Sequence, residues 1–217
     1  QYFPKKKYAG KLLEKELNVI GKILDTGKAP ILSILGGAKV SSKLKIINNL
    51  IDEVDQLIIA GGMAFTFIKA QGGEIGDSLF EPSLIDEANS ILEKANKLRT
   101  QVHLPIDVLA GNEFNNSSEE KVFNTSSIQA GWMGMDISTK TIDAFETVIM
   151  SSNTIFWNGP MGVFEKEKFS TGTRRICEIL KKAKEAGKYV IVGGGDSIAA
   201  LKKFGNDNWV NYISTGG

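Results

Sequence analysis

Two lysines stand where a phosphorylated ligand could bind. Lys39 and Lys43 follow the glycine pair Gly36-Gly37 and begin a helix-like pattern. They are four residues apart, so they share one face of that helix. Cations at a helix N-terminus oppose the macrodipole, which makes the placement mildly unfavourable unless an anion binds there. We interpret the pair as phosphate ligands, with two solvated lysines as the alternative.

Two acidic residues also lie beside glycines. Asp196 follows three consecutive glycines, residues 193–195. A carboxylate at this place could hold Mg²⁺ beside a polyphosphate, but an aspartate there is also an ordinary helix-capping residue. Glu165 follows another glycine turn and could accept hydrogen bonds from ribose hydroxyls, although most surface glutamates have no such role. The residue types leave these alternatives open.

The other reactive residue types indicate structural roles. His103 is the only histidine and Cys177 the only cysteine, which excludes a Cys/His metal cluster. We interpret His103 as structural, since no Cys or Ser partner supports a hydrolase triad. Cys177 lies in an apolar helical pattern, which favours a buried thiol over a nucleophile. Trp132 and Trp157 flank glycines, and we expect both to pack in the interior.

The candidate residues follow short apolar runs that end in glycine. Four such strand-like runs are followed by glycines: residues 30–35, 57–60, 154–157 and 189–192. Continuous apolar runs are typical of strands covered on both faces of a parallel sheet, and ligands bind outside the carboxyl ends of such strands. The pattern predicts a doubly wound α/β domain with a mainly parallel sheet and helices on both faces, a Rossmann-like three-layer αβα fold. The glycine turns should lie at one edge of the sheet.

Further elements complete this domain. Amphipathic patterns predict helices over residues 8–26, 82–98, 139–150 and 171–186. We predict a strand over residues 102–110 and an excursion from the sheet over residues 111–125, interpreted as a hairpin. Residues 209–214 read as a last strand, and residues 215–217 begin a fifth glycine turn without a following helix. We interpret residues 1–217 as one domain and as a fragment.

The composition of the chain limits the kinds of partner that it is expected to bind. The chain has 26 basic and 25 acidic residues and a net charge of +1, which predicts neither nucleic-acid nor membrane-surface binding. Its apolar stretches have the length of strands, so we expect no membrane span. One cysteine allows no internal disulfide, and we expect a reducing, cytoplasmic location.

The glycine turns do not match two common phosphate-binding fingerprints. Residues 36–39 lack the spacing and the Gly-Lys-Ser/Thr of a P-loop, and residues 193–196 lack the third glycine of the dinucleotide fingerprint. Neither a Walker ATPase nor an ordinary NAD site is indicated.

Five motifs in order resemble the C-terminal domain of phosphoglycerate kinase. They are LGGAKV (35–40), GGMAFTF (61–67), WMGMDI (132–137), WNGPMGVFE (157–165) and GGGDS (193–197), and STGG (214–217) resembles the start of the family's last motif. Residues 3–24 resemble the helix that joins the family's two domains. The resemblance covers nearly the whole chain, and five ordered motifs are far more specific than one.

The resemblance implies Mg²⁺-dependent, reversible phosphoryl transfer between 1,3-bisphosphoglycerate and ADP, giving 3-phosphoglycerate and ATP in glycolysis, by a cytoplasmic monomer. Lys39 would neutralise charge on the moving phosphoryl group, and the helix that begins near Gly195 would point at it. Lys43 would bind the nucleotide phosphates, Glu165 the ribose, and Asp196 the Mg²⁺. The remaining nucleotide-binding positions would be Gly37, Gly61, Gly62, Gly134, Met135, Asn158, Gly159, Pro160, Val163, Gly194, Gly195 and Ser197.

The sequence departs from the family in two ways. Ser42, Met135 and Ser138 stand where the family commonly has Asp, Leu and Gly. The family's N-terminal substrate domain and C-terminal tail have no counterpart in the sequence, so we expect nucleotide binding without catalysis from this chain alone. Two alternatives are a stand-alone nucleotide-sensing domain and a nicotinamide-dependent dehydrogenase with an atypical glycine loop.

Overall fold

The structure is a computed structural model that describes residues 27–115 and 117–214. The predicted helix over residues 8–26 and the glycine turn over residues 215–217 lie outside the described residues. Everything that follows concerns the described part of the chain.

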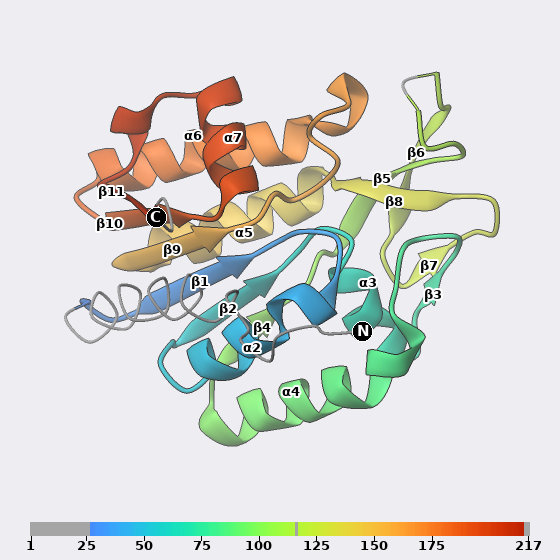
Figure 1. Cartoon of the computed structure of the whole chain (residues 1–217), viewed down its shortest axis with the longest axis horizontal. Coiled ribbons are helices and arrows are strands. Elements are labelled where there is room, and N and C mark those ends of the chain that lie inside the picture. Colours follow the sequence, from blue (N-terminus) through green and yellow to red (C-terminus); the bar gives the residue numbers. More distant parts are fainter. Residues whose placement is uncertain (1–26, 116, 215–217) are drawn as a thin grey trace, which may run out of the picture.

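A six-stranded parallel sheet forms the centre of the molecule (Figure 1). Its strand order is β11-β10-β9-β1-β2-β4. The strands are β1 (Ile31–Leu35), β2 (Gln56–Ile59), β4 (Gln101–His103), β9 (Thr154–Asn158), β10 (Tyr189–Gly193) and β11 (Tyr212–Ser214). All five residues of β1 and of β9 are buried, as expected for central strands covered on both faces.

Helices cover both faces of this sheet (Figure 1). One face carries α2 (Val40–Leu50), α3 (Ala64–Ala70) and α4 (Ile85–Leu98), and the other carries α5 (Thr139–Ser151), α6 (Thr171–Glu185) and α7 (Gly195–Phe204). Side chains of β1 alternate between the two resulting cores: Leu35 packs in the first, whereas Leu32 and Ile34 pack in the second. The predicted three-layer αβα fold is confirmed.

A smaller antiparallel sheet extends from the main one and has the order β6-β5-β8. It consists of β5 (Asp107–Gly111), β6 (Glu120–Asn124) and β8 (Met133–Ile137), and the short strands β3 (Glu74–Ile75) and β7 (Ser127–Ile128) pair beside it. Antiparallel β5 and β6 form a hairpin, as predicted, but its first strand begins at Asp107, before the predicted range of residues 111–125. The single strand predicted over residues 102–110 is wrong, because the chain changes sheet between β4 and β5. Pro105 lies at that break, where it lacks a backbone N–H for a ladder.

The element boundaries differ from expectation in two further places. The predicted strand over residues 209–214 is partly wrong, because a 3₁₀ turn, η3 (Asp207–Trp209), precedes the three-residue strand β11. The side chain of Asn206 accepts a hydrogen bond from the Asn208 amide and stabilises this turn. The predicted helix over residues 82–98 begins with another such turn, η1 (Pro82–Leu84), before α4. Short 3₁₀ turns of this kind are frequent at helix ends.

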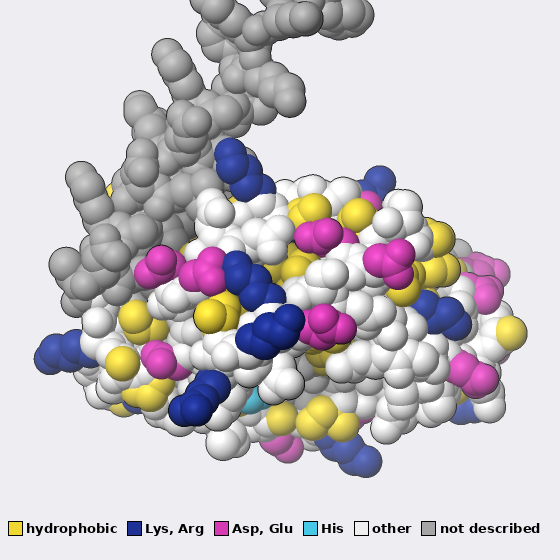
Figure 2. Space-filling view, turned by 90° about the horizontal axis from the view of Figure 1, so that it is seen from below, with side chains coloured by type: hydrophobic (Ala, Val, Ile, Leu, Met, Phe, Trp, Pro, Cys, Tyr) yellow, Lys and Arg dark blue, Asp and Glu magenta, His cyan; other side chains and the backbone are white. Residues whose placement is uncertain are grey.

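The surface has a mixed charge. On the face shown in Figure 2, lysine, arginine and acidic side chains lie interspersed among polar and apolar ones. No helix in residues 27–115 and 117–214 is long and apolar enough to cross a membrane.

Candidate functional site

The site lies where the order of the strands reverses. Strand β1 pairs with β2 on one side and with β9 on the other, so the chain connections diverge between β1 and β9. Open α/β sheets bind ligands at the carboxyl ends of strands at such a point. Here the turn after β1 meets the turn after β9, with the Gly36 amide donating to the Asn158 carbonyl at 3.0 Å. A Cβ on Gly36 would overlap the carbonyl oxygen of Pro160, so only glycine permits this approach.

A pocket of about 540 Å³ opens beside these turns. Its volume is in the range of small-molecule sites. Its walls are mostly glycine and apolar side chains, and few ionisable residues line it: Glu165, Lys166, Asp136 and Asp196. The sequence-predicted residues that line it are Gly37, Gly61, Gly62, Gly134, Met135, Pro160, Val163, Glu165 and Asp196.

Close packing shapes the wall of this larger pocket. A Cβ on Gly134 would overlap the ring of Phe65, which is buried on α3 and lines the pocket. The Gly134 amide donates to the Ser78 hydroxyl at 2.9 Å. The Val163 amide donates to the Met135 carbonyl at 2.8 Å and joins the loop after β9 to β8. The pocket is therefore preformed by backbone contacts.

A second pocket of about 270 Å³ adjoins the first and is polar. It shares Gly37, Ala38 and Asp196 with the larger pocket. Its other sequence-predicted residues are Lys39, Lys43, Asn158, Gly159, Gly194, Gly195 and Ser197. An apolar pocket beside one lined by lysines and a helix N-terminus fits a ligand with an apolar ring at one end and an anionic group at the other.

Helix α7 starts at the smaller pocket without a side-chain cap. Its N-cap is Gly194, which has a φ of 84°, and no side chain bonds to its first turn. Asp196 lies exposed in this turn and makes no capping bond, so it is a first-turn residue, as the structural alternative allowed, and not the N-cap. Ser197 is buried, and its hydroxyl accepts a hydrogen bond from the Gly159 amide at 2.5 Å. Ser197 thus fixes the turn after β9.

Lys43 links α2 to the same turn. Its ammonium group donates to the side-chain oxygen of Asn158, which is 2% exposed. A Cβ on Gly194 would lie 2.9 Å from that oxygen, so Asn158 also packs against the start of α7. Helix α2 and the start of α7, which are far apart in the sequence, therefore both contact the buried side-chain amide of Asn158.

This arrangement agrees with the comparisons with known proteins. The sequence profile of phosphoglycerate kinase matches residues 1–217. The chain belongs to the phosphoglycerate kinase family. It is 48% identical over 208 residues to the phosphoglycerate kinase of Finegoldia magna and 44% identical over 211 residues to that of Rhodococcus jostii. These matches cover 96% and 97% of this chain and 52% of each relative.

Solved structures of phosphoglycerate kinases have the same fold. The structure from Coxiella burnetii superposes with a TM-score of 0.87 at 38% identity, and the one from Pyrococcus horikoshii with 0.73 at 27% identity. Each match covers 94% of this chain, and 52% and 51% of the two solved chains. The chain spans about half the length of the phosphoglycerate kinases that it matches.

The anion expected at the start of α2 is supplied by the protein. Lys39 is the N-cap residue of α2, and the carboxylate of Glu81 accepts hydrogen bonds from the Ser41 amide at 3.0 Å and the Ser41 hydroxyl at 2.5 Å. A negative charge at this helix end offsets the unfavourable lysine. The protein itself therefore places one negative charge at this helix end, which the sequence pattern did not reveal.

Asp136 is a buried acidic residue in the wall of the larger pocket. Burial raises the pKa of Asp136 to about 8, although the amides of Gly172 and Ile137 donate to the carboxylate at 2.6 and 2.9 Å and act in the opposite direction. The bond from Gly172 ties β8 to the first turn of α6. Asp136 therefore holds two walls of the site together.

The histidine and the cysteine are structural, as predicted. His103 is half-buried and bonds to the Gln56 side chain at 3.1 Å, and burial lowers the pKa of His103. Cys177 is buried in α6, where burial, and to a lesser degree the charge of Glu178, raises its pKa to about 12. A thiol with such a pKa is not a nucleophile at neutral pH.

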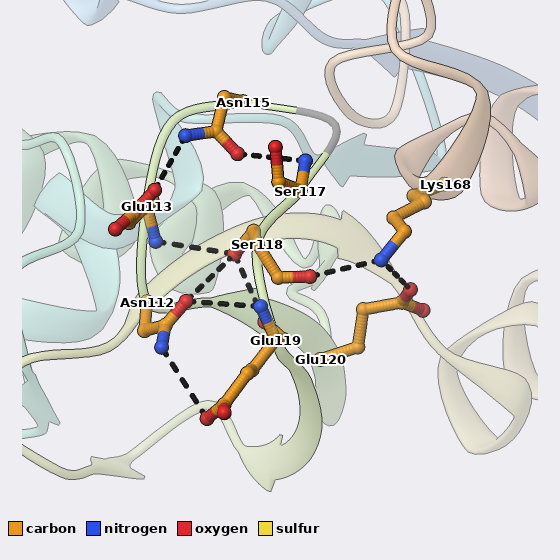
Figure 3. Close-up of polar contacts among 8 residues, drawn as sticks. All are labelled: Asn112, Glu113, Asn115, Ser117, Ser118, Glu119, Glu120 and Lys168. Carbon is orange, nitrogen blue, oxygen red and sulfur yellow. Dashed lines mark hydrogen bonds and ion pairs between the residues drawn. The ribbon is translucent and has the colours of Figure 1, made fainter.

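A hairpin tip lies at the rim of the larger pocket and carries Phe114, which is 62% exposed and lines the pocket. The ammonium group of Lys166 lies 4.7 Å from the Phe114 ring centroid. Figure 3 shows how this tip is fixed: the Ser118 hydroxyl bonds to Asn112 at 3.1 Å, and Lys168 donates to the Ser118 carbonyl at 2.9 Å. Lys168 also pairs with Glu120 at 3.1 Å and ties the hairpin to the loop after β9.

Every site residue predicted from the sequence lines one or both pockets. The structure adds Phe65, Leu79, Phe114 and Lys166 to the larger pocket, and Glu81 at the first turn of α2. Phe65 lies within the motif of residues 61–67, so the sequence contained a signal for it. Leu79, Phe114 and Glu81 lie outside all five motifs, and only the folded chain brings them to the site.

Proposed function

We propose that this chain is the nucleotide-binding half of a phosphoglycerate kinase. In the whole enzyme it would serve Mg²⁺-dependent, reversible phosphoryl transfer between 1,3-bisphosphoglycerate and ADP, which gives 3-phosphoglycerate and ATP. The observation that carries the proposal is the pair of adjoining pockets, one apolar and one lined by lysines, at the strand-order reversal of the sheet. Their order matches the base, ribose and phosphates of a nucleotide.

The larger pocket would take the adenine base and the ribose. Gly134 lets the Phe65 ring pack directly against β8, and Met135 and Val163 add apolar wall to the pocket. Glu165 is exposed at this pocket and can accept hydrogen bonds from ribose hydroxyls.

The smaller pocket would take the phosphates. Lys43 would exchange its internal bond with Asn158 for a phosphate oxygen, and Lys39 would neutralise charge on the moving phosphoryl group. Gly195 begins α7, whose uncapped first turn offers amides and a positive helix end to the same group. Phosphoryl transfer needs mainly positioning and fixed positive charge, which these residues supply.

The residues present fit a magnesium ion bound together with a nucleotide. Asp196 is the carboxylate that lines the smaller pocket. Protein sites commonly hold Mg²⁺ by one or two carboxylates and the substrate phosphates, so one carboxylate here is sufficient. The described residues contain no cluster of three or more metal-ligating side chains. When bound, the ion would neutralise phosphate charge; Asp196 would hold it in place.

The acid substrate would depend on the other half of the relatives' length. The described residues place Lys39 and Lys43 at the smaller pocket, and the rest of the relatives' length would supply the glycerate-binding surface. We therefore propose that the 217 residues alone bind nucleotide but do not turn over, and that hinge closure brings the two substrates together in the whole enzyme. We also propose a monomer in the cytoplasm, consistent with the near-neutral charge and the single, buried cysteine.

Calorimetry tests the proposed function. The 217-residue chain should bind Mg-ADP and Mg-ATP with measurable heat, should bind ADP more weakly without Mg²⁺, and should not bind NAD. Absence of binding to any adenine nucleotide would overturn the proposal, and preferential binding of NAD would favour a dehydrogenase. Steady-state kinase turnover by the pure chain would contradict the proposed need for a second half.

A further inference from the structure

One short segment lines the larger pocket and contacts the helix that begins beside the smaller one. Residues 76–81 follow β3 and precede η1. Within this segment, the Ser78 hydroxyl accepts the Gly134 amide at 2.9 Å, and Leu79 lines the larger pocket. Glu81, at its end, accepts two hydrogen bonds from Ser41 in the first turn of α2. The segment thus joins the wall of the apolar pocket to the helix that carries both lysines.

Glu81 is itself held in place. Its amide donates to the hydroxyl of Thr66 at 3.1 Å, and Thr66 is buried on α3. Burial opposes the charged form of Glu81, but hydrogen bonds from Ser41 and from the Val40 amide, together with the charge of Lys39, leave its pKa below the ordinary value. A carboxylate anchored through α3 and charged at neutral pH is a fixed acceptor for the first turn of α2.

We infer that Glu81 is a positioning residue for Lys39 and Lys43. It bonds to the first turn of α2, where Lys39 is the N-cap and Lys43 lies less than one turn beyond Ser41. It touches neither pocket itself, so its effect on a ligand passes through the two lysines. Glu81 also occupies amides at the start of α2, which directs an anion toward the uncapped start of α7. This inference rests on the proposed nucleotide binding.

Replacing Glu81 has two opposing effects on the affinity for an anion, so the direction of the measured change tests the inference. Removing the negative charge of Glu81 beside Lys39 would, by electrostatics alone, strengthen the binding of an anion. Loss of the hydrogen bonds would release the first turn of α2 and with it the lysines, which weakens phosphate binding. We infer that positioning dominates, because the bonds from Ser41 are direct whereas the charge of Lys39 acts over a longer distance.

The test compares ligands that share a base but differ in phosphate. Binding of ADP and of adenosine to the 217-residue chain is measured by calorimetry for wild type, Glu81→Ala, Glu81→Gln and the control Glu93→Gln, an exposed glutamate on α4. We expect Glu81→Ala to weaken ADP binding about fivefold to tenfold and to change adenosine binding less than twofold. Glu81→Gln keeps one acceptor oxygen, so its ADP affinity should lie between those of wild type and Glu81→Ala. The ADP affinity of Glu93→Gln should match that of wild type.

The outcomes separate this inference from the proposed function. Unchanged or tighter ADP binding by Glu81→Ala would overturn the positioning role, while ADP binding by wild type would leave the proposed function intact. Equal weakening of ADP and adenosine would also overturn it, because it would indicate general damage to the domain. If wild type bound neither ligand, the proposed function would fail and the inference with it. If Glu81→Ala fails to fold, the same comparison of ADP and adenosine affinities is made with Glu81→Gln and decides the question.

Discussion

Replacing Lys43 by methionine tests the phosphate end of the site. Methionine keeps most of the apolar stem of lysine and removes the charge. The internal bond from the Lys43 ammonium group to Asn158 involves one charge, whereas a bond to phosphate joins two opposite charges and is the stronger of the two. The difference leaves a loss of about 1–2 kcal/mol in ADP binding, which is a factor of roughly 5–30 in affinity.

The assay is calorimetry with ADP and adenosine on Lys43→Met and on Lys45→Met. Lys45 is exposed on the same helix and lines neither pocket, so its replacement is a matched control. Adenosine has no phosphate, so its affinity should be the same in all three proteins. ADP affinity of Lys43→Met equal to wild type would refute the reasoning, and so would an equal loss with Lys45→Met.

Four other substitutions test separate parts of the structure. Asp196→Asn should abolish the Mg²⁺ dependence of ADP binding in calorimetry and leave metal-free affinity near wild type. Asp196 makes no capping bond and only its charge lies in the first turn of α7, so a loss of stability above about 1 kcal/mol would contradict this. Gly36→Ala should lower the free energy of unfolding in urea by about 3 kcal/mol, since the new methyl group meets rigid backbone, and a loss below about 1 kcal/mol would show that the turn can move. The raised pKa of Asp136 means that the folded chain retains a proton which the unfolded chain releases. Stability should therefore fall between about pH 4 and pH 8, by at most about 1.4 kcal/mol per pH unit, and Asp136→Asn should lack this slope; parallel pH profiles of the two proteins would refute the assignment. Ser33→Ala should raise the free energy of unfolding by about 1 kcal/mol, because the buried Ser33 hydroxyl has no hydrogen-bond partner in the described structure, and a decrease would reveal a missed one.

The parts of the fold that were predictable are those with continuous apolar runs. Residues 154–157 read as a buried strand, and β9 (Thr154–Asn158) is one, because burial on both faces leaves an unbroken apolar sequence. The break at Pro105 was not recognised, because the residues on both sides of it form strands and only the change of sheet shows that they are two. Local pattern does not encode which sheet a strand joins.

The site could be predicted where backbone must approach backbone or ligand, because glycine is then required. Gly36 and Gly159 mark such a contact in the sequence itself. Glu81 could not be predicted in this way. It caps a helix that begins 41 residues earlier, from position 40 to position 81, and nothing in its own neighbourhood indicates that long-range contact.

The pairing of β1 with β9 also determines when this site can exist during folding. Ile31 lies opposite Thr154, so the turns after the two strands meet only after a long loop of chain has closed. Residues before Asn158 cannot complete either pocket, because the lining of each pocket includes residues from Asn158 onward. Loops of this length close late, because their entropy is lost before their contacts form. Nucleotide binding would therefore recognise only chains that have completed their sheet, and a bound nucleotide would stabilise the whole domain against unfolding instead of one local segment.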